Sequence, residues 1–176
     1  MQMCIKFKQA LLGAFCCCLL TACLSEDESD SEAGSLKAGD TVPAFTVVMN
    51  DGEPLSSAEL RGEVAVILFF NTRCKDCQQE LPVIQRIYED YGSRIRLVGI
   101  SREDGLASVT NYWQAFGLTF PFSPQEGRDV YALFAQSRIP RVYLVDRTLT
   151  IRKVYADSPL ATYEDLSADL DFLLSE

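Results

Sequence analysis

The sequence predicts an α/β domain in which helices cover both faces of a central mixed β-sheet, with an N-terminal β-hairpin as an extension. The first observation is a run of apolar, β-branched and aromatic residues at 64–71, which is typical of a strand buried on both faces. The second is the stretch 84–91, where apolar residues recur at the spacing of one helical face. The third is a pair of strand-like segments, 141–146 and 150–155, joined by a tight turn.

The first half of the domain contains the predicted hairpin and the first parallel pair of strands. A strand at 44–49 is followed by the turn signal Asn50-Asp51-Gly52 and a short return strand. Ser56, with Glu59 three residues later, is a capping-box pattern and indicates a short helical turn. The central strand, its helix and a second buried strand at 95–100 then form a βαβ unit, whose two strands are expected to be parallel.

Two further helices are expected between this unit and the hairpin of the second half. Asp104 is predicted to cap the first, and core packing is predicted for its apolar stripe: Val109, Tyr112, Trp113 and Phe116. Residues 118–122 are expected to be extended. The second helix is expected at 129–136, with three apolar side chains pointing inward: Val130, Leu133 and Phe134.

The chain is predicted to end with a helix that packs on the sheet. Thr162, with Asp165 three residues later, is a second cap signal. The inward face of this helix is formed by leucines: Leu166, Leu170, Leu173 and Leu174.

The N-terminal residues are predicted to be a targeting segment rather than part of the fold. Lys6 and Lys8 precede an apolar run at 10–20, which is too short to span a membrane comfortably, and small residues precede Cys23. Residues 1–22 therefore resemble a bacterial lipoprotein signal peptide. The resemblance implies cleavage before Cys23 and lipidation of its thiol, and the alternatives are an ordinary secretory signal or an uncleaved anchor.

Residues 23–38 are expected to be a flexible acidic linker to a domain at 39–176. The segment is rich in serine and acidic residues and has too few apolar residues to offset the entropy of ordering. Leu24, directly after the cysteine, favours outer-membrane anchoring by the rule of the lipoprotein family. We therefore expect a lipid-anchored protein of the cell envelope, on the periplasmic face of the outer membrane or at the cell surface.

Composition excludes several classes of function. The 176 residues, 48% of them hydrophobic, suit a single domain with its own core. The formal charge of -9 and the lack of a basic cluster in the domain argue against a nucleic-acid partner. The chain has no histidine, which removes Ser-His and Cys-His nucleophilic machinery and every histidine-containing metal site.

Cys74 and Cys77 carry the chemistry that the sequence predicts. They are the two cysteines of the domain, because the other five of the seven fall at or before position 23. A zinc site normally needs four ligands, and no second pair of ligands exists, so no metal is expected. The pair lies where a buried strand passes into the first turn of a helix, and free backbone amides and the helix dipole stabilise a thiolate there. A structural disulfide is disfavoured, because closing so short a loop removes little unfolded-state entropy.

Nearly the whole of the segment 39–176 resembles the thioredoxin fold in its extracytoplasmic branch, the thiol–disulfide oxidoreductases similar to TlpA and ResA. The resemblance is carried by the paired phenylalanines before Cys74-x-x-Cys77, by Glu80-Leu81-Pro82 after it, by Ile139-Pro140 directly before a strand, and by the N-terminal hairpin. It implies a thioredoxin-like fold and thiol–disulfide exchange with other proteins. No cofactor is implied beyond a redox-active Cys74–Cys77 disulfide.

The resemblance also implies roles for individual residues. Cys74 is the expected exposed nucleophile, and Cys77, one turn further into the helix, is the expected buried resolving thiol. Glu80 is expected to assist proton transfer at the buried thiol, with a pKa raised toward neutrality if its carboxyl is desolvated. Pro140 is the expected cis-proline, and its donor-free backbone presents the Ile139 carbonyl and amide to an extended substrate chain.

Two residues beside the thiols depart from the family pattern. Arg73 stands where a tryptophan is usual, and Asp76 stands where a proline is usual. Arg73 and Lys75 are expected to favour a thiolate at Cys74, whereas Asp76 opposes it through its like charge. These three residues are therefore predicted to tune the redox potential, in a direction that the sequence leaves open.

The leading hypothesis is a membrane-anchored oxidoreductase that reduces or exchanges disulfides of extracytoplasmic proteins. Its expected partners are protein disulfides or thiols in the cell envelope and an upstream membrane reductant. One alternative is a thiol peroxidase, although Ile67 and Asn71 occupy the positions of the proline and threonine that peroxiredoxins need before the cysteine. Another is a copper-delivery module, which in this superfamily uses a CxxxC pair and a histidine that this chain lacks. The last is a non-catalytic, partner-binding lipoprotein on the same fold.

Overall fold

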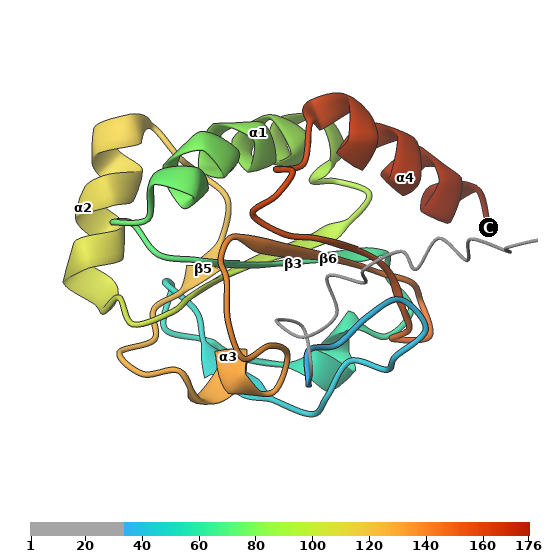
Figure 1. Ribbon diagram of the computed structural model, residues 1–176, viewed down its shortest axis with the longest axis horizontal. Coiled ribbons are helices and arrows are strands. Elements are labelled where there is room, and N and C mark those ends of the chain that lie inside the picture. Colours follow the sequence, from blue (N-terminus) through green and yellow to red (C-terminus); the bar gives the residue numbers. More distant parts are fainter. Residues whose placement is uncertain (1–33) are drawn as a thin grey trace, which may run out of the picture.

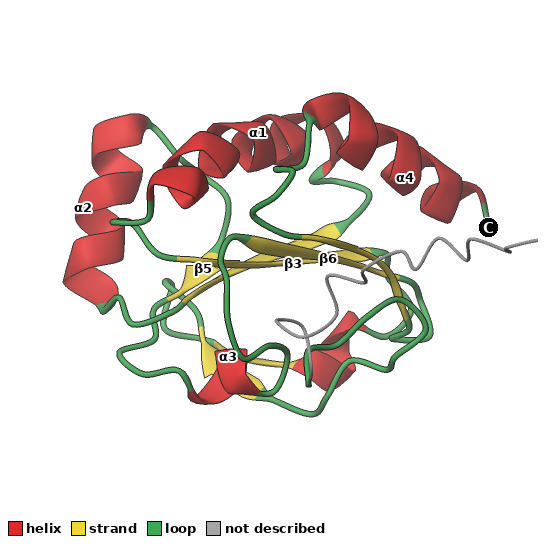
Figure 2. Ribbon diagram, in the orientation of Figure 1, coloured by secondary structure: helices red, strands yellow, loops and turns green. Residues whose placement is uncertain are grey.

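A five-stranded mixed sheet with helices on both faces forms the centre of the computed structural model, which describes residues 34–176 (Figures 1 and 2). The strand order is β5-β4-β3-β6-β7. The strands are β3 (Ala65–Phe70), β4 (Arg96–Ser101), β5 (Phe122–Ser123), β6 (Arg141–Val145) and β7 (Ile151–Tyr155). β3, β4 and β5 run parallel, while β6 is antiparallel to both β3 and β7. The predicted mixed sheet and its C-terminal hairpin are confirmed.

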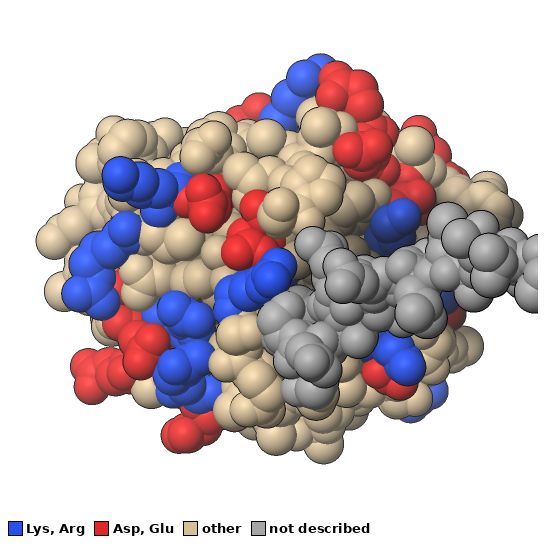
Figure 3. All heavy atoms as spheres, viewed as in Figure 1, with Lys and Arg blue, Asp and Glu red and all other residues tan. Residues whose placement is uncertain are grey.

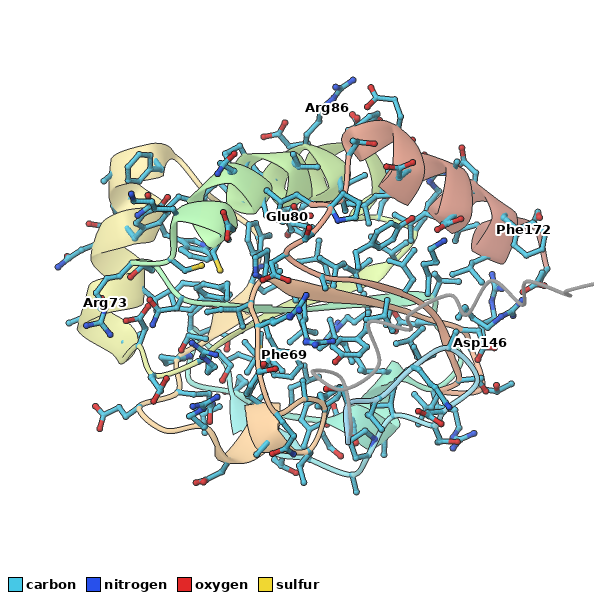
Figure 4. All side chains as sticks on the ribbon, in the orientation of Figure 1. Phe69, Arg73, Glu80, Arg86, Asp146 and Phe172 are labelled. Atoms are coloured by element: carbon cyan, nitrogen blue, oxygen red, sulfur yellow. The ribbon has the colours of Figure 1, made fainter. Side chains whose placement is uncertain are left out.

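The central strand β3 is buried along its whole length, as its apolar sequence predicts. Phe69 packs on the lower face of the sheet as drawn in Figure 4, against the rings of Tyr131, Phe134 and Tyr143. Phe70 points to the other face, where its ring meets Trp113. Alternation of side chains along a strand therefore builds two core layers from one run of residues.

Three helices cover one face of the sheet. They are α1 (Lys75–Tyr91), α2 (Leu106–Phe116) and α4 (Tyr163–Ser175), and Figure 1 shows α4 beside α1. Right-handed crossovers from β3 to β4 and from β4 to β5 place α1 and α2 on the same side, since the three parallel strands follow one another across the sheet. The inward face of α1 contains the predicted Ile84, Ile87 and Tyr91.

The opposite face is covered by shorter elements. These are the hairpin β1 (Thr46–Val48) and β2 (Pro54–Ser56), the 3₁₀ helix η2 (Ser57–Leu60) and α3 (Asp129–Ala132). The N-terminal hairpin is confirmed, although β1 is shorter than predicted. It is joined to β5, because the Phe122 amide donates to Asn50 Oδ1 at 3.0 Å and the Ser123 hydroxyl donates to the Val48 carbonyl at 2.7 Å.

Both predicted capping boxes are present. At η2, the Ser56 amide donates to Glu59 Oε1 at 2.8 Å and the Ala58 amide donates to Ser56 Oγ at 3.3 Å. At α4, the Asp165 amide donates to Thr162 Oγ1 at 3.1 Å, and the Thr162 amide donates to Asp165 Oδ2 at 3.4 Å. These bonds satisfy amides that have no partner within the helix.

The predictions for α2 were wrong in two respects. Its N-cap is Gly105, and the Asp104 carboxylate turns instead toward the loop before α1. Of the predicted stripe, Val109 and Trp113 are buried, but Phe116 is 65% exposed. The indole N–H of Trp113 donates to the Phe120 carbonyl at 3.0 Å, so this ring can be buried with its polar group satisfied.

The predicted helix at 129–136 is also too long. α3 ends at Ala132, Leu133 is 46% exposed rather than inward, and Tyr131 is buried in its place. The Tyr131 hydroxyl donates to the Arg138 carbonyl at 2.5 Å, which holds the chain in an irregular path toward Pro140. Phe134 is buried as predicted.

The signal peptide predicted at 1–22, Cys23 and most of the linker predicted at 23–38 lie outside the described residues. Among the helices of residues 34–176, none combines the length and the apolar character needed to cross a membrane.

Candidate functional site

The two thiols of the described domain lie at the junction of β3 and α1. Cys74 is the N-cap residue of α1 and is half-buried, whereas Cys77, in the first turn, is fully buried. Both are free thiols in this structure. The difference in access follows from the geometry of a helix start, because the N-cap projects from the end of the helix while a residue one turn later faces the sheet.

The chain around Pro140 lies directly against Cys74. The Cys74 thiol donates to the Ile139 carbonyl, with 3.6 Å between sulfur and oxygen. The Ile139–Pro140 peptide bond is cis, as the resemblance implies, and both residues are buried. The structure therefore places Cys74 beside Ile139, 65 positions later in the chain, and beside the adjacent Pro140.

Burial dominates the titration of Cys77. Removal from water raises the pKa of its thiol far above the ordinary value, and the neighbouring Cys74 side chain raises it further. The backbone amide of Asn71 and the positive charge of Arg102 act in the opposite direction but do not offset burial. At neutral pH this thiol is protonated, so it becomes a nucleophile only if a neighbouring group accepts its proton.

Glu80 lies one helical turn after Cys77, on the same buried face of α1 (Figure 4). Its side chain is 1% exposed, and neither carboxyl oxygen has a hydrogen-bond partner of acceptable geometry among the described residues. Burial raises the pKa of Glu80 to about 7, and the nearby backbone amide of Ala161 counters this only slightly. Glu80 is therefore a carboxyl that can exchange a proton near neutral pH, as expected for a desolvated acid.

A set of polar bonds fixes the loop between β3 and Cys74. The Asn71 carbonyl accepts from the Cys74 amide at 3.1 Å, and its side chain accepts from the Arg73 amide at 2.9 Å and donates to the Arg102 carbonyl at 2.9 Å. The Gln78 side chain donates to the Thr72 carbonyl at 2.8 Å. Because the loop is held from both sides, the position of Cys74 is set before any partner binds.

Asp104 completes this support from the end of β4. Its carboxylate accepts from the Thr72 amide at 2.6 Å and from the Thr72 hydroxyl at 2.9 Å. Neither Asn71 nor Asp104 was predicted to belong to the site. The signal that could have found them is their position. Asn71 directly follows β3 and Asp104 lies three residues after β4, and the carboxyl ends of these two parallel strands meet at one edge of the sheet.

The charged residues beside Cys74 differ in exposure, and one of them is ion-paired. Arg73 is 76% exposed, and its guanidinium lies 3.6 Å from the Asp104 carboxylate, so its charge is already paired. Lys75 is exposed and Asp76 is half-buried. Figure 3 shows Lys and Arg side chains interspersed with Asp and Glu over the face that is drawn, and Figure 4 places Arg73 beside α2.

A mostly apolar groove of about 330 Å³ separates α1 from α2 close to the thiols. Its walls include Gln78, Pro82, Tyr112 and Phe116, and the last two rings stack with their centroids 4.3 Å apart. A larger hollow of about 540 Å³ is lined by residues that include Arg94 and Arg96, and neither cavity includes Cys74 or Cys77 in its lining. Within residues 34–176, His, Cys, Asp and Glu side chains form no group of three or more that could hold a metal ion.

Comparison with known proteins agrees with this arrangement. Residues 38–154 match the AhpC/TSA family. The thiol-disulfide oxidoreductase ResA of Bacillus thuringiensis (strain Al Hakam) is 23% identical over 113 residues, which cover 64% of this chain and 65% of ResA. The chain thus spans slightly less than two thirds of that relative.

Solved structures with the thioredoxin fold match more of the chain. A solution structure from Bacteroides thetaiotaomicron has a TM-score of 0.74 and 28% identity, covering 81% of this chain and 95% of that one. The crystal structure of the thio-disulfide isomerase from Thermus thermophilus has a TM-score of 0.65 and 27% identity, covering 78% and 97%. The predicted thioredoxin-like fold is thereby confirmed, and its resemblance to the TlpA/ResA-like proteins of the thioredoxin superfamily is supported. The chain belongs to the AhpC/TSA family.

Proposed function

We propose that this protein is a thiol–disulfide oxidoreductase that exchanges disulfides with other proteins through Cys74 and Cys77. The observation that carries the proposal is the pairing of a half-buried thiol at a helix N-terminus with a fully buried thiol one turn behind it. The relatives named for thiol–disulfide exchange support the same reaction.

The two thiols carry the electrons of the proposed reaction. The Cys74 thiolate attacks one sulfur of a partner disulfide, the partner's S–S bond breaks, and the departing partner sulfur takes up a proton. Cys77 then loses its proton and attacks the Cys74 sulfur of the mixed disulfide, which releases the second partner thiol. Two electrons have passed to the partner, and the protein holds a Cys74–Cys77 disulfide, which a dithiol reductant must reopen.

Glu80 is proposed as the base for the second step. Burial keeps the Cys77 thiol protonated at neutral pH, so its attack requires a proton acceptor. Glu80 has both carboxyl oxygens without a hydrogen-bond partner in the described domain, and its pKa of about 7 suits a group that takes and returns a proton.

Ile139 and Pro140 are proposed to receive the partner's backbone. Within residues 34–176, the bond found at the Ile139 carbonyl is the weak one from the Cys74 thiol, and a substrate chain next to Cys74 can replace it with an amide. Pro140 has no amide of its own, so it does not compete for acceptors on the incoming chain. An extended segment around the substrate cysteine fits these constraints.

We further propose that the domain works in the cell envelope, tethered by a lipid at Cys23, and that a membrane reductant reopens its disulfide. The sequence of residues 1–23 supports the location and the anchor. Reduction of protein disulfides is proposed as the usual direction, because that is the role which the resemblance implies.

Two observations weigh against the alternatives. A peroxidase needs a polar side chain aimed at the first thiol. Here the Asn71 side chain is bonded to the Arg73 amide and to the Arg102 carbonyl after β4, and Ile67 is wholly buried in β3. The Glu80 carboxyl is buried without a hydrogen-bond partner among residues 34–176, which costs stability, and a purely binding role gives no reason for that cost.

Insulin reduction driven by dithiothreitol tests the proposal with the full chain. Wild-type protein is expected to accelerate the reaction, and Cys74→Ser is expected to reduce the rate to that of dithiothreitol alone. Ser175→Ala, at the far end of α4, is the matched control and is expected to behave like wild type. Unchanged activity of Cys74→Ser would remove the proposal, and rapid peroxide consumption with no insulin reduction would replace it with a peroxidase.

A further inference from the structure

We propose that Asp104 is a positioning residue for Cys74: it anchors the loop that carries the thiol and pairs with Arg73, which withholds that guanidinium from the Cys74 thiolate. The inference rests on the proposed exchange reaction at Cys74. It concerns how strongly the reduced form of the couple is favoured, rather than whether exchange occurs.

The anchoring is visible in the hydrogen bonds of a buried charge. The Asp104 side chain is 3% exposed, and it is held by the Thr72 amide at 2.6 Å and by the Thr72 hydroxyl at 2.9 Å. A carboxylate removed from water keeps its charge only where donors surround it, and charge-assisted bonds of this length are the stronger kind. Thr72 is two residues before Cys74, so these bonds fix the peptide from which Cys74 projects.

Asp104 is itself fixed by the neighbouring strand ends. Its carbonyl accepts from the Ser101 hydroxyl at 2.6 Å and from the Gln125 amide at 3.2 Å. Asp104 therefore joins the loops that follow β3, β4 and β5, where the carboxyl ends of the three parallel strands meet. Because Asp104 is bonded to Thr72, Ser101 and Gln125, we expect it to restrict the movement of the loop that carries Cys74.

The same carboxylate also sets the charge around the thiol. Its Oδ1 atom lies 3.6 Å from the Arg73 guanidinium, and Arg73 is adjacent to Cys74 in the chain. Other charged or titratable groups beside Cys74 are Lys75, Asp76 and Cys77 on α1, and Arg102 after β4 acts on Cys77 through its positive charge. Replacing Asp104 with asparagine keeps an oxygen that can accept from the Thr72 amide, removes one negative charge and frees Arg73.

The charge change is expected to favour the reduced protein. A thiolate at Cys74 exists only in the reduced form, so a more positive surrounding lowers the free energy of that form relative to the disulfide. The Arg73 guanidinium is largely exposed, so the dielectric constant of water applies to it. At that value, one charge about 3–6 Å from the thiolate changes the thiol–disulfide equilibrium constant by about three- to tenfold. A tenfold change corresponds to ~30 mV for a two-electron couple.

The experiment measures the equilibrium of the Cys74–Cys77 couple in the full chain against mixtures of reduced and oxidised dithiothreitol. The readout is the fraction of the Cys74 and Cys77 tryptic peptides joined by a disulfide, so the other five cysteines do not contribute. Asp104→Asn is expected to shift the equilibrium toward the dithiol by about three- to tenfold. Arg73→Gln alone is expected to change it by less than about twofold, because its charge is already paired. In the Asp104→Asn background, Arg73→Gln is expected to return the constant toward wild type.

This double-mutant cycle separates the charge effect from a merely structural role. Asp171→Asn is the matched control, because Asp171 is also ion-paired, to Arg94 at 3.9 Å, but lies on α4. The inference is overturned if the thiol–disulfide equilibrium constant of Asp104→Asn equals that of wild type. It is also overturned if Arg73→Gln changes that constant equally in the wild-type and Asp104→Asn backgrounds. If Asp104→Asn does not fold, Arg73→Gln alone still tests the inference. A shift of tenfold or more in its thiol–disulfide equilibrium constant toward the disulfide would contradict the proposed pairing of Arg73 with Asp104.

The inference and the proposed function fail in different ways. If Cys74→Ser still reduces insulin, the exchange reaction is not at Cys74, whatever Asp104 does. If Cys74→Ser is inactive while the Asp104→Asn constant equals that of wild type, the exchange reaction stands and only the role of Asp104 is wrong.

Discussion

Cys77 and Glu80 lie one turn apart on the buried face of α1, and burial raises the pKa of both side chains. The two groups are complementary. The thiol holds its proton too tightly to attack unaided, and the carboxyl has been moved to a pKa at which it can accept a proton near neutral pH. A structural role alone does not explain a glutamate that has neither solvent nor a hydrogen-bond partner within the described domain.

The first prediction concerns the pH dependence of stability. The pKa of Glu80 is about 7 in the folded protein and has an ordinary value of 4.5, so between these values the folded state binds more protons than the unfolded state. The contribution of Glu80 to the free energy of unfolding is therefore fully present below about pH 4.5. It is lost as the pH rises through about 7, and the loss levels off at about 3 kcal/mol above that pH. Glu80→Gln is expected to remove this loss, making the variant more stable than wild type at pH 8 but similar to it at pH 4.5. Urea unfolding at the two pH values measures the difference, and equal gains at both would contradict the assignment.

The second prediction concerns resolution of the mixed disulfide. Glu80→Gln keeps the shape of the side chain but cannot accept a proton, so release of the partner from Cys74 is expected to slow by about 10- to 100-fold. In wild type, the release rate is expected to rise with pH through about 7, as Glu80 ionises. Stopped-flow mixing with a fluorescent peptide disulfide follows the release. A variant with the wild-type rate and pH profile would show that Cys77 loses its proton elsewhere.

The third prediction tests the loop before Cys74. Asn71 is 8% exposed, and its side chain bonds to the Arg73 amide and to the Arg102 carbonyl. Asn71→Ala leaves both groups unpaired, so the free energy of unfolding is expected to fall by about 1–3 kcal/mol. Gln78→Ala, which removes a single bond from an exposed side chain, is expected to cost less than about 1 kcal/mol. Urea denaturation of both variants checks the order, and a reversed order would contradict the proposed role of Asn71 in the loop.

The fourth prediction concerns stability away from the thiols. Thr162→Ala removes the side-chain bond to the Asp165 amide, and is expected to lower the free energy of unfolding by about 1 kcal/mol. Insulin reduction is expected to stay at the wild-type rate at temperatures where the variant is folded. Thermal unfolding and the activity assay together separate a loss of fold from a loss of chemistry. A variant with normal stability would mean that the capping box contributes little to α4.

The sequence was informative where one physical signal dominated. The buried strand 65–70, the Cys74-x-x-Cys77 segment and both capping boxes were found because apolar runs and cap residues act locally. The burial of Glu80 was anticipated from its spacing and the resemblance. The full extent of this burial was not, because the surroundings of the carboxyl include residues remote in sequence, such as Ala161.

Asp104 and Phe116 show why the rest could not be predicted. An aspartate before a helical segment normally caps that helix, but here the Thr72 amide, 32 positions away, is the partner. Phe116 continues the apolar stripe of α2, yet it stacks on Tyr112 in the groove beside α1 instead of entering the core. Both outcomes depend on which strand ends and helices become neighbours, which a local pattern does not contain.

The most direct test of the account is to locate the disulfide that forms when the protein reduces a substrate. Trypsin cleaves after Arg73 and Lys75, so Cys74 and Cys77 fall on separate peptides, 74–75 and 76–86. After reaction of the reduced full chain with oxidised insulin, mass spectrometry is expected to find these two peptides joined, with two substrate thiols released for each joined pair. Insulin thiols released while both peptides remain free would contradict the account.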